Sequence, residues 1–125
     1  MPIRTLIIVI AICFISGIQT FAFERSSRLY ALNELDVQKN VAVLLRVNKC
    51  VGCYLANAQL SGMDLSYADL RKANLIGVTF IRATLTGANL KGAKLAGANF
   101  SGAQWVDGSI CLVGSVGRCI KSQPE

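Results

Sequence analysis

Histidine does not occur anywhere in the 125-residue sequence. The commonest general base is therefore missing, and nucleophile pairs of the Ser-His or Cys-His type are excluded. The sequence also lacks a phosphate-binding loop, a dinucleotide-binding turn and a run of metal-ligating residues. These absences predict a protein that is not an enzyme and that carries no metal or other cofactor.

Acidic residues are scarce, with 7 Asp and Glu against 13 Lys and Arg, so the formal net charge is +6. Within the repeat described below, Asp64 and Asp69 are the two carboxylates that stand close together, and both take outward positions. Exposed carboxylates of this kind are far more often solvated surface charges than catalytic acids. We therefore interpret both as surface charge.

The N-terminal apolar run, residues 6–15, is too short for a comfortable membrane span. It follows Arg4 and precedes a small-x-small site at residues 20–22, so residues 1–22 are predicted to be a secretory signal cleaved after Ala22. Cleavage would remove Arg4 and lower the formal charge from +6 to +5. Two alternatives stay open. One is a lipoprotein acceptor at Cys13, which is disfavoured because Ile12 is not small, and the other is an uncleaved anchor.

A five-residue repeat runs through the middle of the chain. Apolar anchors recur at every fifth position, namely Leu55, Leu60, Leu65, Leu70, Leu75, Phe80, Leu85, Leu90, Leu95, Phe100, Trp105 and Ile110. The residue two positions before each anchor is usually small, and eight of the twelve are Ala. These positions hold Cys53, Ala58, Met63, Ala68, Ala73, Val78, Ala83, Ala88, Ala93, Ala98, Ala103 and Gly108.

A period of five fits neither a helix nor a strand, but a chain that turns a corner every five residues brings all anchors into one core. Small residue, polar residue and anchor then alternate in, out and in, and two residues make the bend. Glycine at the second bend position eases the corner in six units, at Gly62, Gly77, Gly87, Gly92, Gly97 and Gly102. Four corners close a coil of twenty residues, so residues 50–110 are predicted to form about three coils with ~4.8 Å spacing.

The repeat resembles the pentapeptide-repeat family, whose motif reads A(D/N)LXX. The close matches in this sequence are Ala68-Asp69-Leu70, Ala73-Asn74-Leu75, Ala88-Asn89-Leu90 and Ala98-Asn99-Phe100. The resemblance implies an all-β solenoid, a right-handed quadrilateral β-helix, and leaves function open because family members have many roles. Met63, Val78 and Trp105 depart from the motif and suggest local bulging or end-capping. The long acidic DNA mimics of this family are a poor match, because this chain is basic and short.

Residues 23–49 are predicted to hold a capping helix. From Asn33 to Lys49, the apolar residues Val37, Val41, Leu44 and Leu45 trace one helical face, and Asn33 or Asp36 is expected to cap its start. An open solenoid needs its first coil covered, so this helix is expected to lie across the N-terminal end. A membrane-surface or partner-binding helix is the alternative.

Of the five cysteines, Cys13 is expected to leave with the signal. The other four fall in two pairs at opposite ends of the stack, which disfavours a single zinc site. The five-residue phase turns Cys50 and Cys53 inward on the first coil. We expect Cys50 to pair with Cys53, and Cys111 with Cys119, so that the second bridge folds residues 111–125 back as a disulfide-capped tail.

The cysteine-containing tail and the CxxC before the first coil resemble an exported subgroup of the pentapeptide-repeat family. That resemblance implies the periplasm, the thylakoid lumen or secretion. The expected function is an exported structural or protein-interaction module. The alternatives are a thiol-disulfide redox protein that uses Cys50 and Cys53, and an anion-binding surface module.

The repeat also predicts a surface for a partner. Arg71 and Lys91 are twenty residues apart and therefore stack, with Lys72 and Lys94 at the neighbouring corner. Like charges at this spacing attract an acidic partner or a lipid headgroup, and in principle nucleic acid, which is not expected here. Ordinary solubilising charge is the interpretation that we favour over all of these. On the next two faces Ile76 and Ile81 are predicted to point outward; they are too small a patch to prove an interface, but they mark the first place to look for one.

Overall fold

A computed structural model describes residues 20–122, with side chains from residue 24 onward. The chain divides into two compact units, Met1–Leu35 and Asp36–Glu125, which are described separately. The predicted apolar signal run, Arg4 and Cys13 lie outside the described residues. Between residues 20 and 122, no helix is both long and apolar enough to cross a bilayer.

One helix, α2 (Thr20–Val47), precedes the repeats. It begins well before Asn33, so the expectation that Asn33 or Asp36 caps its start is wrong. Residues 20–32 contain neither glycine nor proline, and nothing in that stretch interrupts helical hydrogen bonding. The helix is followed by a residue with positive φ, Asn48 (φ 53), whose N–H donates to the Leu44 carbonyl at 2.8 Å.

The part of α2 that belongs to the second unit covers the first coil. Val37 and Leu44 are buried in the same core as the repeats, and Val41 packs against that core. Leu45 is 47% exposed, contrary to expectation, because consecutive helical residues are turned about 100° apart. The Asn40 side-chain amide donates to the Tyr54 carbonyl at 2.9 Å. Through these contacts, residues 36–47 cover the first coil.

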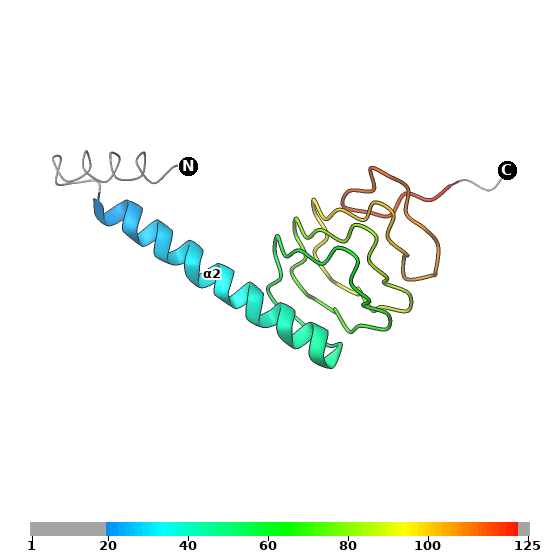
Figure 1. The fold of residues 1–125 in the computed structure, drawn as a ribbon, viewed down its shortest axis with the longest axis horizontal. Helices are drawn as coiled ribbons and strands as arrows, with labels where there is room; N and C mark the ends of the chain where they lie inside the picture. The colour runs from blue at the N-terminus through cyan, green and yellow to red at the C-terminus, as the bar shows by residue number, and fades with distance from the viewer. Residues whose placement is uncertain (1–19, 123–125) are drawn as a thin grey trace. The chain divides into compact units, whose positions relative to one another are not determined.

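The repeats form stacked coils (Figure 1). Parallel bridges join residues twenty positions apart along four columns. The columns are Lys49–Asp69–Asn89, Tyr54–Asn74–Lys94, Gln59–Thr79–Asn99 and Asp64–Thr84–Gln104. The bridges are isolated and no extended strand occurs between residues 20 and 122, because each unit bends again after a single paired position.

Each corner is a tight turn with positive φ at its third residue. In one of these turns the Ala58 N–H donates to the Leu55 carbonyl at 3.0 Å, and Asn57 between them has φ 62. Tyr67 takes the same conformation and lies over Gly87 of the next coil, where an added Cβ would come within 2.4 Å of the tyrosine ring. Gly87 therefore serves the backbone conformation and also makes room for a neighbouring side chain.

The anchors stack into one core. From Leu55 to Leu85 every anchor is fully buried. Phe80 and Phe100 stack with ring centroids 5.2 Å apart, and Trp105 meets Phe100 edge-on at 4.9 Å. Val78 is also fully buried, with its backbone hydrogen bonds intact, so no bulge occurs there. Met63, the other large residue at a small position, is 38% exposed.

The repeat ends earlier than predicted. After Trp105 the chain turns at Gly108 and reverses, so that Ile110 pairs antiparallel with Gln104. Ile110 is 58% exposed instead of acting as an inward anchor, and Cys111 beside it is buried. The boundary predicted at residue 110 therefore falls about five residues too late, because one reversed turn shifts the phase of the side chains.

Candidate interaction surface

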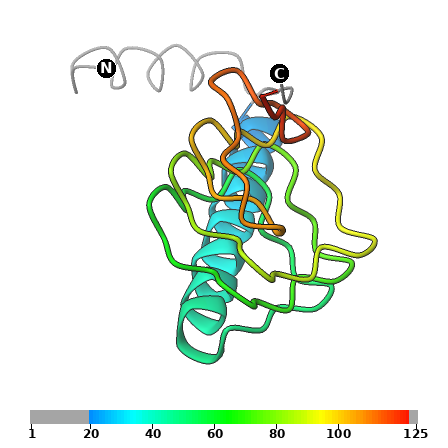
Figure 2. The same cartoon turned by 90° about the vertical axis from the view of Figure 1, so that its right-hand side faces the viewer.

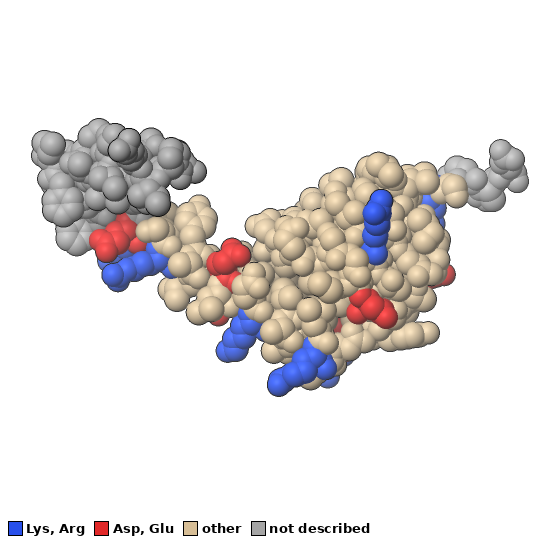
Figure 3. Space-filling model, viewed as in Figure 1, with Lys and Arg blue, Asp and Glu red and all other residues tan. Residues whose placement is uncertain are grey.

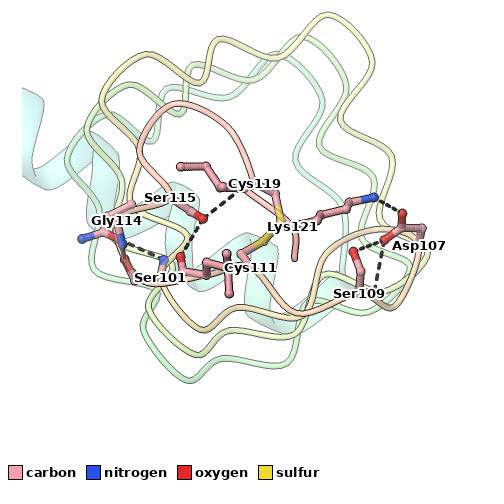
Figure 4. The surroundings of a disulfide bond; sticks show 11 residues. Ser101, Asp107, Ser109, Cys111, Gly114, Ser115, Cys119 and Lys121 are labelled. Atoms are coloured by element: carbon pink, nitrogen blue, oxygen red, sulfur yellow. Dashed lines mark hydrogen bonds and ion pairs between the residues drawn. A yellow bond between two sulfur atoms is a disulfide. The ribbon is translucent and has the colours of Figure 1, made fainter. Parts of the chain in front are cut away.

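The structure joins Cys50 to Cys53 and Cys111 to Cys119 by disulfide bonds. Their Cα atoms are 5.3 Å and 5.0 Å apart, within the range that a disulfide spans. The first bridge lies where α2 meets the first coil, and the second closes the C-terminal tail over the last coil (Figure 4). Both bridges thus stand at ends of the solenoid.

The surroundings of the CxxC do not favour redox chemistry. Cys50 is 2% exposed, and its sulfur lies 3.6 Å from the Asn40 carbonyl. The CxxC follows the C-terminal end of α2, where the helix dipole opposes a thiolate, whereas reactive thiols typically lie at helix N-termini. The disulfide therefore closes the first turn of the repeats, directly after the helix.

A polar network that the sequence did not predict supports the C-terminal tail. Ser115 is fully buried, donates to the Leu112 carbonyl at 2.7 Å and accepts from the Ile120 N–H at 3.0 Å. The Ser101 hydroxyl accepts from the Gly114 N–H at 3.1 Å, which fastens the tail to the last coil (Figure 4). Ser115 lies at a multiple of five residues from the anchors, where the repeat would place an apolar side chain. A serine at that position was the only feature of the sequence that pointed to this network.

The tail is held on its other side by charge. The Lys121 ammonium pairs with Asp107, which also accepts from the Ser109 N–H and hydroxyl. The hydrogen bond from Lys121, followed by those from Ser109, lowers the pKa of the Asp107 carboxyl well below its usual range. Figure 4 shows these side chains across the tail from Ser101 and Gly114.

The outward Asp and Asn residues of the repeat cap their own corners. Asp64 accepts from the Ser66 N–H at 3.0 Å and from its hydroxyl at 2.6 Å, and these bonds lower the pKa of Asp64. Asn99 binds Ser101 in the same way, and the Asn89 oxygen accepts from the Lys91 N–H at 3.1 Å. These are Asx turns, in which the side chain bonds the backbone two residues on. The D/N of the motif therefore stabilises corners.

Metal binding has no support in the part of the chain that the structure describes. There, no group of three or more Cys, Asp or Glu side chains lies close enough to hold a metal ion.

The predicted basic strip is only partly available to a partner. Arg71 is engaged by Asp69 through two hydrogen bonds, Nε to Oδ1 at 2.7 Å and a second guanidinium nitrogen to Oδ2 at 2.8 Å. The side-chain hydrogen bond with Arg71 is the main cause of the lowered pKa of Asp69, and the same bond raises the pKa of Arg71. Arg71 is therefore not available to bind an acidic partner.

The three lysines of the strip remain available. Lys72, Lys91 and Lys94 are exposed, and none of them forms an ion pair with any residue between 24 and 122. The Lys72 N–H donates to the Lys91 carbonyl at 3.0 Å, so the two residues meet at one corner. Lys94 follows on the adjoining face, where it pairs with Asn74. We call Lys72, Lys91 and Lys94 the lysine corner.

The outward isoleucines lie where the repeat placed them. Ile76 and Ile81 are 40% and 36% exposed, at successive corners of the same coil. Figure 3 shows that much of the solenoid surface on the side in view carries no charge, so an apolar corner is not unusual. Two half-exposed side chains do not form an apolar patch of the size that marks an interface.

The chain was compared with known proteins. The family model for pentapeptide repeats matches with eight copies over residues 53–92 and 73–104. These residues belong to the pentapeptide-repeat family. Pentapeptide repeats imply a right-handed β-helix and, in general, a structural or interaction module that does not catalyse reactions. No functionally curated protein matches the chain.

A solved structure is also similar to this chain. It is alr5209, a pentapeptide repeat protein from Nostoc Pcc 7120, with 27% identity. The match covers 53% of this chain and 75% of the other, with a TM-score of 0.26.

Proposed function

We propose that this protein is an exported interaction module that binds an acidic segment of a partner protein through the lysine corner, Lys72, Lys91 and Lys94. The observation that carries the proposal is the difference between Arg71 and its neighbours. Arg71 is neutralised by Asp69, whereas the three lysines at the same corner and face have no carboxylate partner between residues 24 and 122. Charges of one sign held on a rigid scaffold attract the opposite charge at long range.

Several finer features belong to the same proposal. The solenoid contains about three coils and is quadrilateral, which is supported by columns of three bridged residues such as Lys49, Asp69 and Asn89. Export by way of residues 1–22 to the periplasm, a thylakoid lumen or the medium is supported by the two disulfides, since such bonds persist in oxidising compartments.

Charge reversal tests the lysine corner. The variant Lys72→Glu/Lys91→Glu/Lys94→Glu should lose at least tenfold in affinity for a labelled polyglutamate peptide at low salt, with an unchanged circular dichroism spectrum. The control Arg46→Glu/Arg82→Glu/Arg118→Glu changes the net charge equally at other exposed positions and should lose much less.

Two outcomes would overturn the proposal. Equal losses in the two variants would show that only net charge matters. Tighter binding of a DNA duplex than of polyglutamate at matched salt would identify nucleic acid as the partner class.

A further inference from the structure

The backbone ladder of the solenoid leaves one stretch without partners. In each coil, the N–H of an anchor and the N–H of the residue two places later donate to the next coil, as Leu70 does to Asn89 at 3.0 Å and Lys72 to Lys91 at 3.0 Å. The last coil has no coil after it, so these N–H groups can donate only to carbonyls of the C-terminal tail. Phe100 donates to Ser115 and Gly102 to Cys111, so the tail completes this part of the ladder.

The tail does not reach the neighbouring part of the last coil. Between residues 20 and 122, nothing accepts a hydrogen bond from the N–H groups of Leu90, Gly92 and Leu95, and nothing donates to the carbonyls of Ala88 and Ala93. Figure 2 shows the tail, coloured orange to red, crossing one part of the end while the yellow corner of the last coil lies clear of it. We call residues 88–95 the open edge. An unpaired edge of this kind is a template for another extended chain.

The core is also incomplete beneath the open edge. Leu70 and Leu75 are fully buried, whereas Leu90 and Leu95, which stack on them one coil later, are only partly buried. The anchor Phe100 is fully buried, with the tail bonded beside it. The open edge therefore offers two partly buried apolar side chains five residues apart, together with three unused donors and two unused acceptors.

The positive charge of the open edge indicates which kind of chain binds there. Lys91 and Lys94 of the lysine corner belong to the edge itself, and Lys72 lies one coil below, with its Cγ 3.5 Å from where a Cβ on Gly92 would stand. A second copy that paired with the same edge would bring lysines against lysines, and like charges on facing strands are destabilising. An acidic chain would gain from the same contact.

We infer that the open edge binds an extended acidic peptide of a partner protein, which adds one more run of the coil by β-augmentation. This inference rests on the proposed function, since it assigns the way in which the acidic segment binds. The register of the ladder predicts the peptide. Two apolar residues five positions apart cover Leu90 and Leu95, a glycine follows the corner at Gly92, and acidic residues lie above Lys91 and Lys94.

The probe for this inference is a labelled peptide with the order Ala-Asn-Leu-Asp-Gly-Ala-Asp-Leu, tested with the full chain. Its Asn and its second Asp would donate their backbone N–H groups to the Ala88 and Ala93 carbonyls, by the register in which Asn89 donates to Ala68 and Lys94 to Ala73. Methylating these two peptide nitrogens removes the donors and keeps the charges. We expect the methylated peptide to bind about tenfold more weakly, since each lost hydrogen bond to a buried or half-buried group weakens binding several-fold.

Hydrogen exchange supplies the second measurement. The unmodified peptide should slow exchange at the N–H groups of Leu90, Gly92 and Leu95, while the already paired N–H of Leu70 serves as an internal control. Equal affinity of the methylated and unmodified peptides, or unchanged exchange at the open edge, would overturn the inference even if binding still required the lysines.

The remaining outcomes separate the two proposals. Binding that is insensitive to the lysine-corner variant would overturn the proposed function itself. A free protein that forms dimers by sedimentation, and dissociates when the peptide is added, would show that a second copy occupies the edge and would overturn the acidic-peptide assignment.

Discussion

At the scale of single residues, each position of the five-residue unit has its own physical task. The anchor and the small residue fill the core, and the Asp or Asn between them caps the following corner, as Asp64 does for Ser66. The residue with positive φ then sets the turn. Non-glycine residues take that conformation at some cost, and their side chains lean over glycines of the next coil, as Tyr67 does over Gly87.

Truncating two stacked anchors tests how far burial extends. Leu75→Ala should lower the free energy of unfolding by about 2–5 kcal/mol, because it leaves a cavity in a closed stack. Leu95→Ala should cost clearly less, since Leu95 lies one coil further in the same stack and is already partly exposed. Urea unfolding followed by circular dichroism measures both. Equal losses would mean that the last coil is covered in solution, which would contradict the open edge.

Asp107 gives a prediction for acid. Its pKa is lowered in the folded chain, so its contribution to stability is complete above the unfolded pKa of about 4 and is lost as the pH falls below that value. The loss should loosen the tail first and shift the fluorescence of nearby Trp105. Because the pair is exposed, the effect should be small and should weaken in high salt. In Asp107→Asn the fluorescence should vary less between pH 4 and pH 2, and an unchanged titration would contradict this assignment.

At the scale of elements, α2 and the C-terminal tail each cover one end of the solenoid. Each must cover an apolar coil end, and each does so by side chains that do not follow the repeat. The helix supplies Val37 and Leu44 to the core, and the tail supplies Cys111 and the buried Ser115. The tail covers only part of its end, and this asymmetry creates the open edge.

Adjacent leucines in α2 provide a matched test of the helix cap. Leu44 is fully buried and Leu45 is 47% exposed, although the sequence predicted both on the apolar face. Leu44→Ala should lower the free energy of unfolding by about 2–5 kcal/mol, and Leu45→Ala should change it by less than about 1 kcal/mol. Thermal or urea unfolding of the two variants gives the comparison. Similar losses would show that the helix packs by a different face.

At the scale of the whole molecule, the solenoid is a sum of neighbouring coils, so its ends are its weakest points. The two disulfides lie at these ends and close short loops. In the chain-entropy model, bridges of this length contribute on the order of 2 kcal/mol each. They are therefore braces against fraying, with the core supplying the larger share of stability.

Peptide mapping of the oxidised full chain tests this placement. Digestion without reductant should yield Cys50 linked to Cys53 and Cys111 linked to Cys119, and glutathione should reduce neither bridge readily. Replacing Cys111 and Cys119 together by serine should expose Trp105 and shift its fluorescence to the red, while Cys50→Ser/Cys53→Ser should not. Rapid reduction of Cys50–Cys53 with acceleration of insulin reduction would instead support the redox alternative.

The sequence by itself determined the repeat, the family that the repeat matches, the anchors from Leu55 to Trp105 and the outward positions of Asp64, Asp69, Ile76 and Ile81. It could do so because a strict period leaves one way to place every fifth side chain in a common core. Tertiary structure decided the rest. The pairing of Arg71 with Asp69, the exposure of Leu45 and Ile110, and the burial of Ser115 depend on local partners and on how each end is covered. The open edge could not be predicted from the five-residue period for the same reason. A repeat specifies how one coil pairs with the next, but it does not specify which part of the last coil the tail covers.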